Sequence, residues 1–65
     1  MTRFEDYEYS LKVCLDTIKE SESKIEDISD YETQYIFKRL ILANQDLNGI
    51  LSGLVKDLNK QGILQ

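Results

Sequence analysis

Apolar residues recur at intervals of three and four positions along the first 28 residues, and this heptad spacing is the most constraining feature of the chain. Such spacing places side chains along one edge of an α-helix and predicts a narrow helical seam. Leu15 flanks the stripe, and Ser21 is its one polar member. The stripe consists of Phe4, Tyr7, Leu11, Cys14, Ile18, Ser21, Ile25 and Ile28. We therefore expect one amphipathic helix over about residues 3–26.

The seam fails beyond residue 28, because its continuation would place Glu32 and Tyr35 on the stripe. Two capping boxes, Thr2–Glu5 and Ser29–Glu32, mark sites where a helix can begin. We interpret residues 27–29 as a tight turn and expect a second helix over about residues 30–60. The alternative is a single helix of about sixty residues, which the phase break and the second cap disfavour.

The second helix has a broader apolar face than a two-helix seam requires. The residues expected to face the first helix are Ile36, Leu40, Ala43, Leu47, Ile50, Leu51, Leu54 and Leu58, widened by Phe37, Ile41, Asn44, Asn48 and Val55. A face this wide usually contacts two neighbours, here the first helix and a helix of another chain. The expected fold is all-α: residues 1–65 form one domain, an antiparallel two-helix hairpin that dimerises into a four-helix bundle.

The hairpin turn also predicts which residues lie opposite each other. Leu11 should face Leu47, with Ile18 near Leu40. Asn48-Gly49 is a turn signal, but the stripe continues in phase through it, so we expect an unbroken second helix. Lys60 and Gly62 suit the end of that helix. The tail, 63–65, either packs back or frays, and Leu58, Ile63 and Leu64 extend beyond the first helix and need cover from elsewhere.

Size limits how the chain can be stabilised. It has 65 residues, one cysteine and no histidine, so an internal disulfide is impossible and a zinc site is improbable. A chain this short buries only about 60% of its unfolded surface. We therefore expect it to associate with itself, another protein, or both. The lone cysteine, the absence of a long apolar run and the acidic N-terminal residues favour a cytoplasmic protein without a membrane segment.

No catalytic or cofactor-binding pattern is evident. Cys14 lies on the stripe with no histidine to activate it, so we expect a buried core residue, as we do for Tyr7. The segment 27–30 resembles the start of a calcium loop but lacks the glycine and the closing glutamate. We expect no enzyme activity, no cofactor and no metal.

Two sets of residues on the second helix are candidates for partner binding. The first is the surplus apolar surface of Leu47, Leu51, Leu54, Val55 and Leu58. The second is a pattern on the back of the helix, where tyrosines and glycines recur: Tyr31, Tyr35, Leu42, Gly49 and Gly53. Tyrosine is enriched at interfaces, and glycines one turn apart permit close helix approach.

Three functions remain open from the sequence. The first is a regulatory binder, such as an inhibitor, adaptor or chaperone, and the second is a structural subunit of a homo-oligomeric helical assembly. The third is a nucleic-acid-binding hairpin dimer with a Rop-like architecture. The net charge of −4 disfavours the third, because an acidic surface repels phosphates. Residues 1–28 carry four basic and eight acidic residues, whereas residues 29–65 carry four of each.

Overall fold

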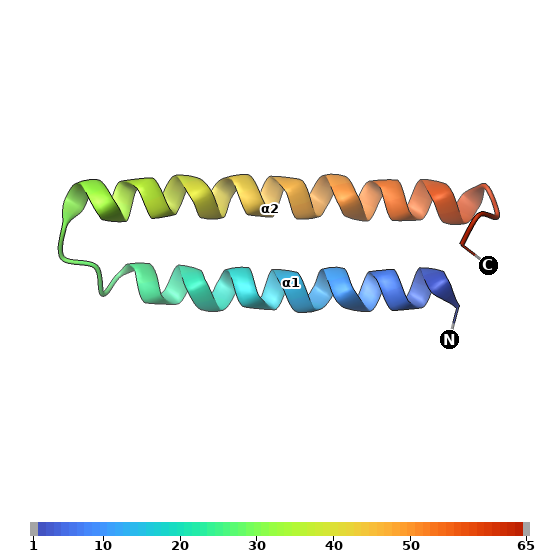
Figure 1. The fold of residues 1–65 in the computed structure, drawn as a ribbon, viewed down its shortest axis with the longest axis horizontal. Helices are drawn as coiled ribbons and strands as arrows, with labels where there is room; N and C mark the ends of the chain where they lie inside the picture. Colours follow the sequence, from blue (N-terminus) through green and yellow to red (C-terminus); the bar gives the residue numbers. More distant parts are fainter. Residues whose placement is uncertain (1, 65) are drawn as a thin grey trace.

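The structure, a computed structural model, describes residues 2–64 as two long helices joined by a short turn (Figure 1). Helix α1 spans Arg3–Ile25 and helix α2 spans Tyr31–Lys60. The helices run antiparallel, so both ends of the chain lie at the end opposite the turn (Figure 1). The hairpin prediction is confirmed, and the single long helix is wrong. Helix α2 continues through Asn48-Gly49, as the uninterrupted stripe predicts.

Polar side chains begin both helices. The Thr2 hydroxyl accepts a hydrogen bond from the backbone amide of Glu5 at 3.2 Å, which confirms that cap. Helix α2 is capped by Asp30 and not by Ser29, so the predicted cap was one residue too early. The Asp30 carboxylate accepts from both the backbone amide and the hydroxyl of Thr33. These bonds, the hydroxyl first, hold the pKa of Asp30 below its usual value.

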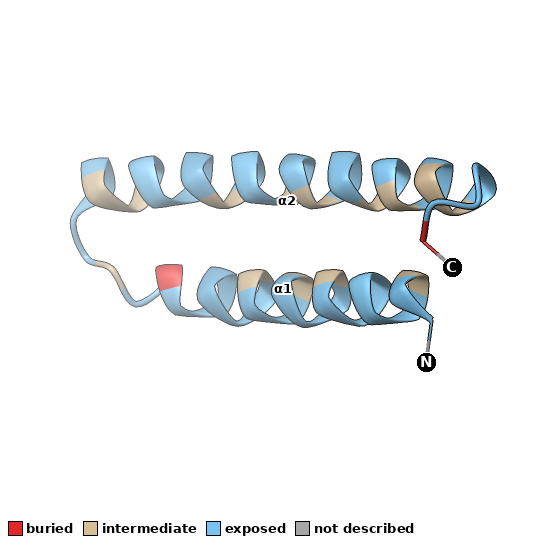
Figure 2. Ribbon diagram, turned by 45° about the vertical axis from the view of Figure 1, so that its right-hand side comes forward, coloured by how far each residue is buried: buried red, intermediate tan, exposed pale blue. Residues whose placement is uncertain are grey.

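Gly62 ends helix α2 in the left-handed conformation, with a φ of 77°, as predicted. The Gly62 amide donates to the Asn59 carbonyl at 3.0 Å, and the Ile63 amide donates to the Leu58 carbonyl at 3.1 Å. This Schellman motif turns the chain back toward α1 (Figure 2). Leu64 is consequently buried, with 3% of its surface exposed. The expectation that Leu64 needs cover from outside its own chain was wrong; Gln65 lies outside the described residues.

The seam between the helices is built from half-buried residues, with Ile25 buried near the turn. Asn48 donates from Nδ2 to the Leu11 carbonyl at 3.0 Å, so Leu11 lies opposite Asn48 and not Leu47. Near the turn, Gln34 donates from Nε2 to the Ile25 carbonyl at 3.3 Å. The seam contains Phe4, Leu11, Leu15, Ile18 and Ile25 from α1, and Ile41, Gln45, Asn48, Ser52 and Val55 from α2.

Helix α2 is thus rotated about its axis by roughly one residue, or 100°, relative to the prediction. Its most apolar stripe does not face α1. The exposed members of that stripe are Ile36, Leu40, Ala43, Leu47, Ile50, Leu51 and Leu54. On α1, Leu15 takes the seam position expected for Cys14. Cys14 and Tyr7 are exposed, and the prediction that both are core residues was wrong.

The hairpin is one helix thick. Its Cα atoms extend over 48 × 18 × 8 Å, so the molecule has two broad faces and no enclosed interior. Within residues 2–64, Ile25 and Leu64 are the buried apolar residues (Figure 2). A helix pair of this kind normally buries its remaining apolar surface against a second layer. The two broad faces therefore decide what the hairpin can bind.

Candidate partner-binding surface

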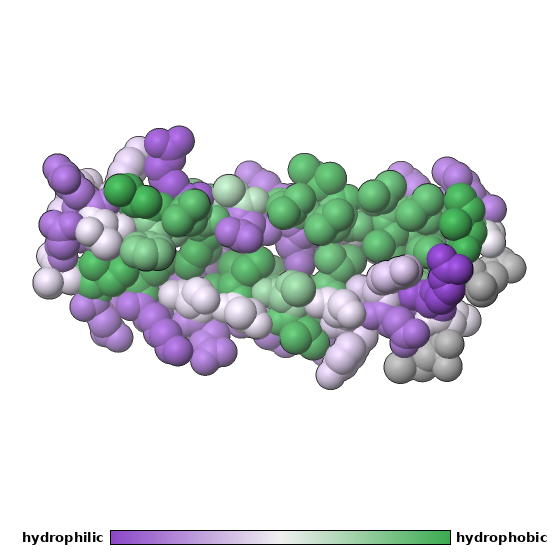
Figure 3. All heavy atoms as spheres, viewed as in Figure 1, coloured by the Kyte–Doolittle hydropathy of each residue, from purple (hydrophilic) through white to green (hydrophobic). Residues whose placement is uncertain are grey.

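One broad face, called the apolar face below, joins the exposed stripe of α2 to one flank of α1. Near the turn, Phe37 and Leu40 of α2 border an open depression of about 440 Å³ together with Ser21 of α1. Helical periodicity continues this face along both helices. Figure 3 shows apolar residues covering α2 and the seam, beside α1 residues of intermediate hydropathy. The apolar face consists of Phe37, Leu40, Asn44, Leu47, Leu51 and Leu54 of α2 and Tyr7, Ser10, Cys14, Thr17 and Ser21 of α1.

The apolar face is large, and the residues that define it are uncharged, while Lys24 borders its depression near the turn. Leu47, near its middle, leaves 51% of its surface exposed. Scattered exposed leucines are ordinary on protein surfaces, but a continuous apolar patch usually marks a site of interaction. Because the residues lie on rigid helices and not on loops, the surface is already shaped for a helical or flat partner.

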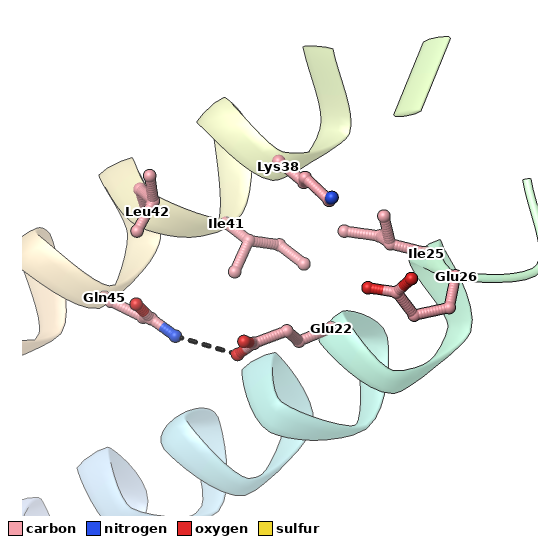
Figure 4. Close-up of a pocket in the computed structure, with 7 residues that line it drawn as sticks. All are labelled: Glu22, Ile25, Glu26, Lys38, Ile41, Leu42 and Gln45. Atoms are coloured by element: carbon pink, nitrogen blue, oxygen red, sulfur yellow. Dashed lines mark hydrogen bonds between the residues drawn. The ribbon is translucent and has the colours of Figure 1, made fainter. Parts of the chain in front are cut away.

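The opposite broad face is polar. Near the turn it has an open depression of about 310 Å³ between the helices (Figure 4). There Gln45 donates from Nε2 to the Glu22 carboxylate at 3.1 Å, across the seam. Glu26 and Lys38 border the same depression, as does Leu42. Acids and a lysine thus share this surface, which gives it no uniformly basic track for a phosphate backbone.

The structure divides the residues expected to bind a partner. Leu47, Leu51 and Leu54 lie on the apolar face and are exposed. Val55 is half-buried in the seam, and Leu58 is also half-buried. Three of the five residues in the first set are therefore exposed on one surface, and the other two are partly covered by the chain itself.

The second set lies away from the apolar face. Leu42 borders the polar depression, and helical spacing places Gly49 and Gly53 on the same side of α2. Tyr31 and Tyr35 are exposed near the start of α2, where the Arg39 guanidinium lies 5.9 Å from the Tyr35 ring centroid. A Cβ built on Gly49 or Gly53 would meet no atom within 4 Å. Within the single chain, these glycines are not needed for close packing.

Sequence reasoning missed the contribution of α1 to the apolar face. Ser10, Cys14, Thr17 and Ser21 form a row of small exposed residues beside the α2 leucines. The signal was present in the heptad stripe, which includes Cys14 and Ser21. That stripe was assigned entirely to contact with the second helix, although three of its eight positions, Tyr7, Cys14 and Ser21, turn out to face the open side.

Metal ions and lipid bilayers each require a particular arrangement of side chains. Within residues 2–64, no three histidine, cysteine or acidic side chains are grouped so that they could hold a metal ion. Neither α1 nor α2 contains a stretch that is both long and apolar enough to cross a bilayer.

Among known proteins, no family model, no curated sequence and no solved structure matches this chain.

Proposed function

We propose that the chain is a small, non-enzymatic protein–protein interaction module, a cytoplasmic regulatory binder that acts as an inhibitor, adaptor or chaperone. The observation that carries the proposal is the continuous apolar face, whose defining residues are uncharged, on a hairpin with almost no core of its own. Burial of apolar surface contributes about 25 cal/mol per Å². A partner that covers this face therefore stabilises both the complex and the fold.

The polar face supports this choice over catalysis. Its carboxylates, Glu22 and Glu26, border a depression that is open to solvent. Acid–base and electrostatic catalysis depend on groups held in sites from which water is largely excluded. The chain also has no histidine that could activate the exposed thiol of Cys14.

Nucleic-acid binding receives less support. A hairpin dimer that binds RNA or DNA needs basic side chains concentrated along one surface. Lys38 instead borders the same depression as Glu22 and Glu26. On the apolar face, Lys24 borders the depression near the turn, but the residues that define the face are uncharged. Neither broad face therefore offers the concentrated basic contact that dominates binding to phosphates.

A matched pair of substitutions tests the proposal. Leu47→Gln changes the apolar face, whereas Leu42→Gln makes the same chemical change on the polar side at a comparably exposed position, 59% against 51%. Covering the exposed half of a leucine contributes roughly 1–1.5 kcal/mol, so Leu47→Gln should weaken binding about tenfold. Leu42→Gln should leave binding unchanged.

The measurement is the dissociation constant of complexes isolated with the wild-type chain, whether they contain further copies or a protein of the source cell. Native mass spectrometry identifies the complex, and titration calorimetry gives its affinity. Equal losses of affinity in the two variants would contradict the assignment of partner binding to the apolar face. If the wild-type chain forms no complex with any protein of its source cell, the proposed regulatory function is wrong. A complex that contains its own copies alone would favour the alternative, a structural subunit of a homo-oligomeric helical assembly.

A further inference from the structure

The single hairpin exposes more surface than a compact protein of its mass. Its accessible surface is 5206 Å² for 7.6 kDa, whereas the scaling for folded monomers gives about 4,300 Å². Its radius of gyration is 15.1 Å, against about 11 Å for a compact chain of this length. The surplus of roughly 900 Å² is close to the ~800 Å² that each partner buries in a standard interface. The surplus is therefore enough for one standard interface on the apolar face.

The direction in which the α1 stripe points indicates where a partner would pack. Leu11, Ile18 and Ile25 turn toward α2, whereas the intervening positions Tyr7 and Cys14 are exposed on the apolar face. In a four-helix bundle each helix has two neighbours, and its apolar stripe points between them. The α1 stripe has this intermediate direction. It predicts a second layer of helices against the apolar face.

Helix α2 repeats the pattern. Ile41 and Val55 turn toward α1, whereas Leu40, Leu47 and Leu51 are exposed on the apolar face. The stripes of both helices are thus displaced from the seam toward the same side. In an isolated hairpin this displacement buries no additional apolar surface. In a two-layer bundle it is needed in every helix, because each helix packs against a neighbour in its own layer and one in the other layer.

Three polar residues of the apolar face, Thr17, Ser21 and Asn44, already have hydrogen-bond partners in their own helices. The Thr17 hydroxyl donates to the Val13 carbonyl at 3.1 Å, and the Ser21 hydroxyl donates to the Thr17 carbonyl at 2.9 Å. Asn44 donates from Nδ2 to the Leu40 carbonyl at 2.8 Å. Burying a donor without a partner costs about 1–3 kcal/mol. Because these donors bond within their own helices, covering them avoids that cost.

The two halves of the apolar face complement each other. Apart from Tyr7, the α1 half is a row of small residues, Ser10, Cys14, Thr17 and Ser21, whereas four of the six residues of the α2 half are leucines. Large residues pack best against small ones across an interface. A two-fold axis parallel to the helices places the leucine row of each copy on the small row of the other. The acids bordering the polar depression, Glu22 and Glu26, then remain on the outside.

Resting on the proposed function as a protein–protein interaction module, we infer that the occupant of the apolar face is a second copy of this chain, which makes the chain a subunit of a homo-oligomeric helical assembly. The two hairpins stack face to face with their turns at the same end. Each α2 lies antiparallel on α1 of the other copy. The residues that define the face are uncharged and the charged side chain that borders its depression is a lysine, Lys24, so the net charge of −4 does not oppose the contact directly. The rival two-fold arrangement has the turns at opposite ends and stacks α1 on α1, placing small residues on small ones.

Mass and disulfide formation test this inference. Light scattering of the wild-type chain at about 50 μM should give twice the monomer mass of 7.6 kDa. Cys14 is the middle residue of α1 (Arg3–Ile25), so the rival arrangement places the two Cys14 thiols together at its axis. In the proposed arrangement they lie diagonally across the bundle, and Cys14 faces the region of Asn44 in the other copy.

The probe mixes the wild-type chain with a tagged Cys14→Ser/Asn44→Cys chain under mild oxidation. A disulfide requires Cα atoms within about 7 Å. The mixed disulfide should form at least tenfold faster than either homodisulfide, and circular dichroism confirms that the variant is helical. A dimer that forms only homodisulfides, or no disulfide, overturns the arrangement, and a trimer or larger assembly overturns the inference. A monomer that binds a different protein through Leu47 overturns the second copy but leaves the proposed function standing.

Discussion

Replacing Ile25 by alanine tests whether this buried residue near the turn holds the two helices together. Ile25 is 5% exposed and borders the depressions on both broad faces, so it fills the space between the helices near the turn. Ile50 is the matched control, because it is also a helical isoleucine but is 69% exposed. Both substitutions remove the same γ and δ carbons.

The structure gives the expected difference between the two variants. Each buried methylene contributes roughly 0.8 kcal/mol, and incomplete collapse around the cavity adds to the loss. Ile25→Ala should therefore lower the free energy of unfolding by about 2.5–4 kcal/mol. Ile50→Ala loses less than 1 kcal/mol of burial, and the better helix propensity of alanine offsets part of it. Its unfolding free energy should stay within about 0.5 kcal/mol of wild type.

Urea unfolding followed by circular dichroism at 222 nm, at one fixed protein concentration, measures both values. A total stability of about 3–10 kcal/mol is expected for a chain of 65 residues. If the total lies near the lower end of this range, Ile25→Ala should lose a large part of its helical signal before any urea is added. Near the upper end, the variant should stay folded in water and unfold at a clearly lower urea concentration. Equal effects of Ile25→Ala and Ile50→Ala would refute the packing described for the turn end of the hairpin.

Three further predictions follow from individual residues. Gly49→Ala with Gly53→Ala should raise the unfolding free energy by about 0.8–1 kcal/mol per site, because the added methyls meet no neighbour; a loss would indicate a close contact on the polar side. Thr33 lowers the pKa of Asp30 in the folded chain. The Asp30 cap therefore contributes fully to the free energy of unfolding above the pKa that Asp30 has in the unfolded chain, and this contribution is lost as the pH falls through the lower pKa of the folded chain. Acid titration of wild type should therefore show a steeper loss below about pH 4 than Asp30→Asn, and parallel curves would contradict the cap. Cys14 should react with a thiol reagent at the rate of a free thiol in dilute protein but more slowly when concentrated, and a concentration-independent rate would argue against its cover by a second copy.

The sequence predicted the helices well because their ends are decided locally. A hydroxyl or carboxylate three residues before an amide is a short-range interaction, as Thr2 and Glu5 show. Gly62 likewise stops α2 because its own backbone adopts a positive φ. The one-residue error at the second cap has a local cause as well. The Asp30 carboxylate accepts two hydrogen bonds from Thr33, and the capping-box pattern, which considers only Ser29 and Glu32, does not include them.

The rotation of the helices could not be predicted in the same way. The apolar residues of α2 span close to half its circumference, so many rotations bury a similar area against α1. The structure selects one that places Asn48 in the seam, where its side chain reaches the Leu11 carbonyl. That choice leaves the α2 leucines outside. The sequence revealed that α2 had surplus apolar surface, but the side of the hairpin that presents it depends on tertiary packing.

The same limit explains the outcome for the candidate site. Leu47, Leu51 and Leu54 were expected to bind a partner because they exceed what one seam requires, and their exposure is consistent with that expectation. Cys14 was misplaced because a heptad stripe reports the average direction of all the neighbours of a helix. When one neighbour belongs to another layer, residues that face it are mistaken for contacts within the hairpin.

The melting temperature of the wild-type chain, measured over a hundredfold range of protein concentration, tests the central claim most directly. Unfolding of a dimer of this size absorbs about 90 kcal/mol, so its melting temperature should rise by about 10 °C over that range. Calorimetry between roughly 5 and 500 μM covers the concentrations in which a standard interface would form and dissociate. A rise of this size is the result expected if a second copy covers the apolar face. A melting temperature independent of concentration would contradict it.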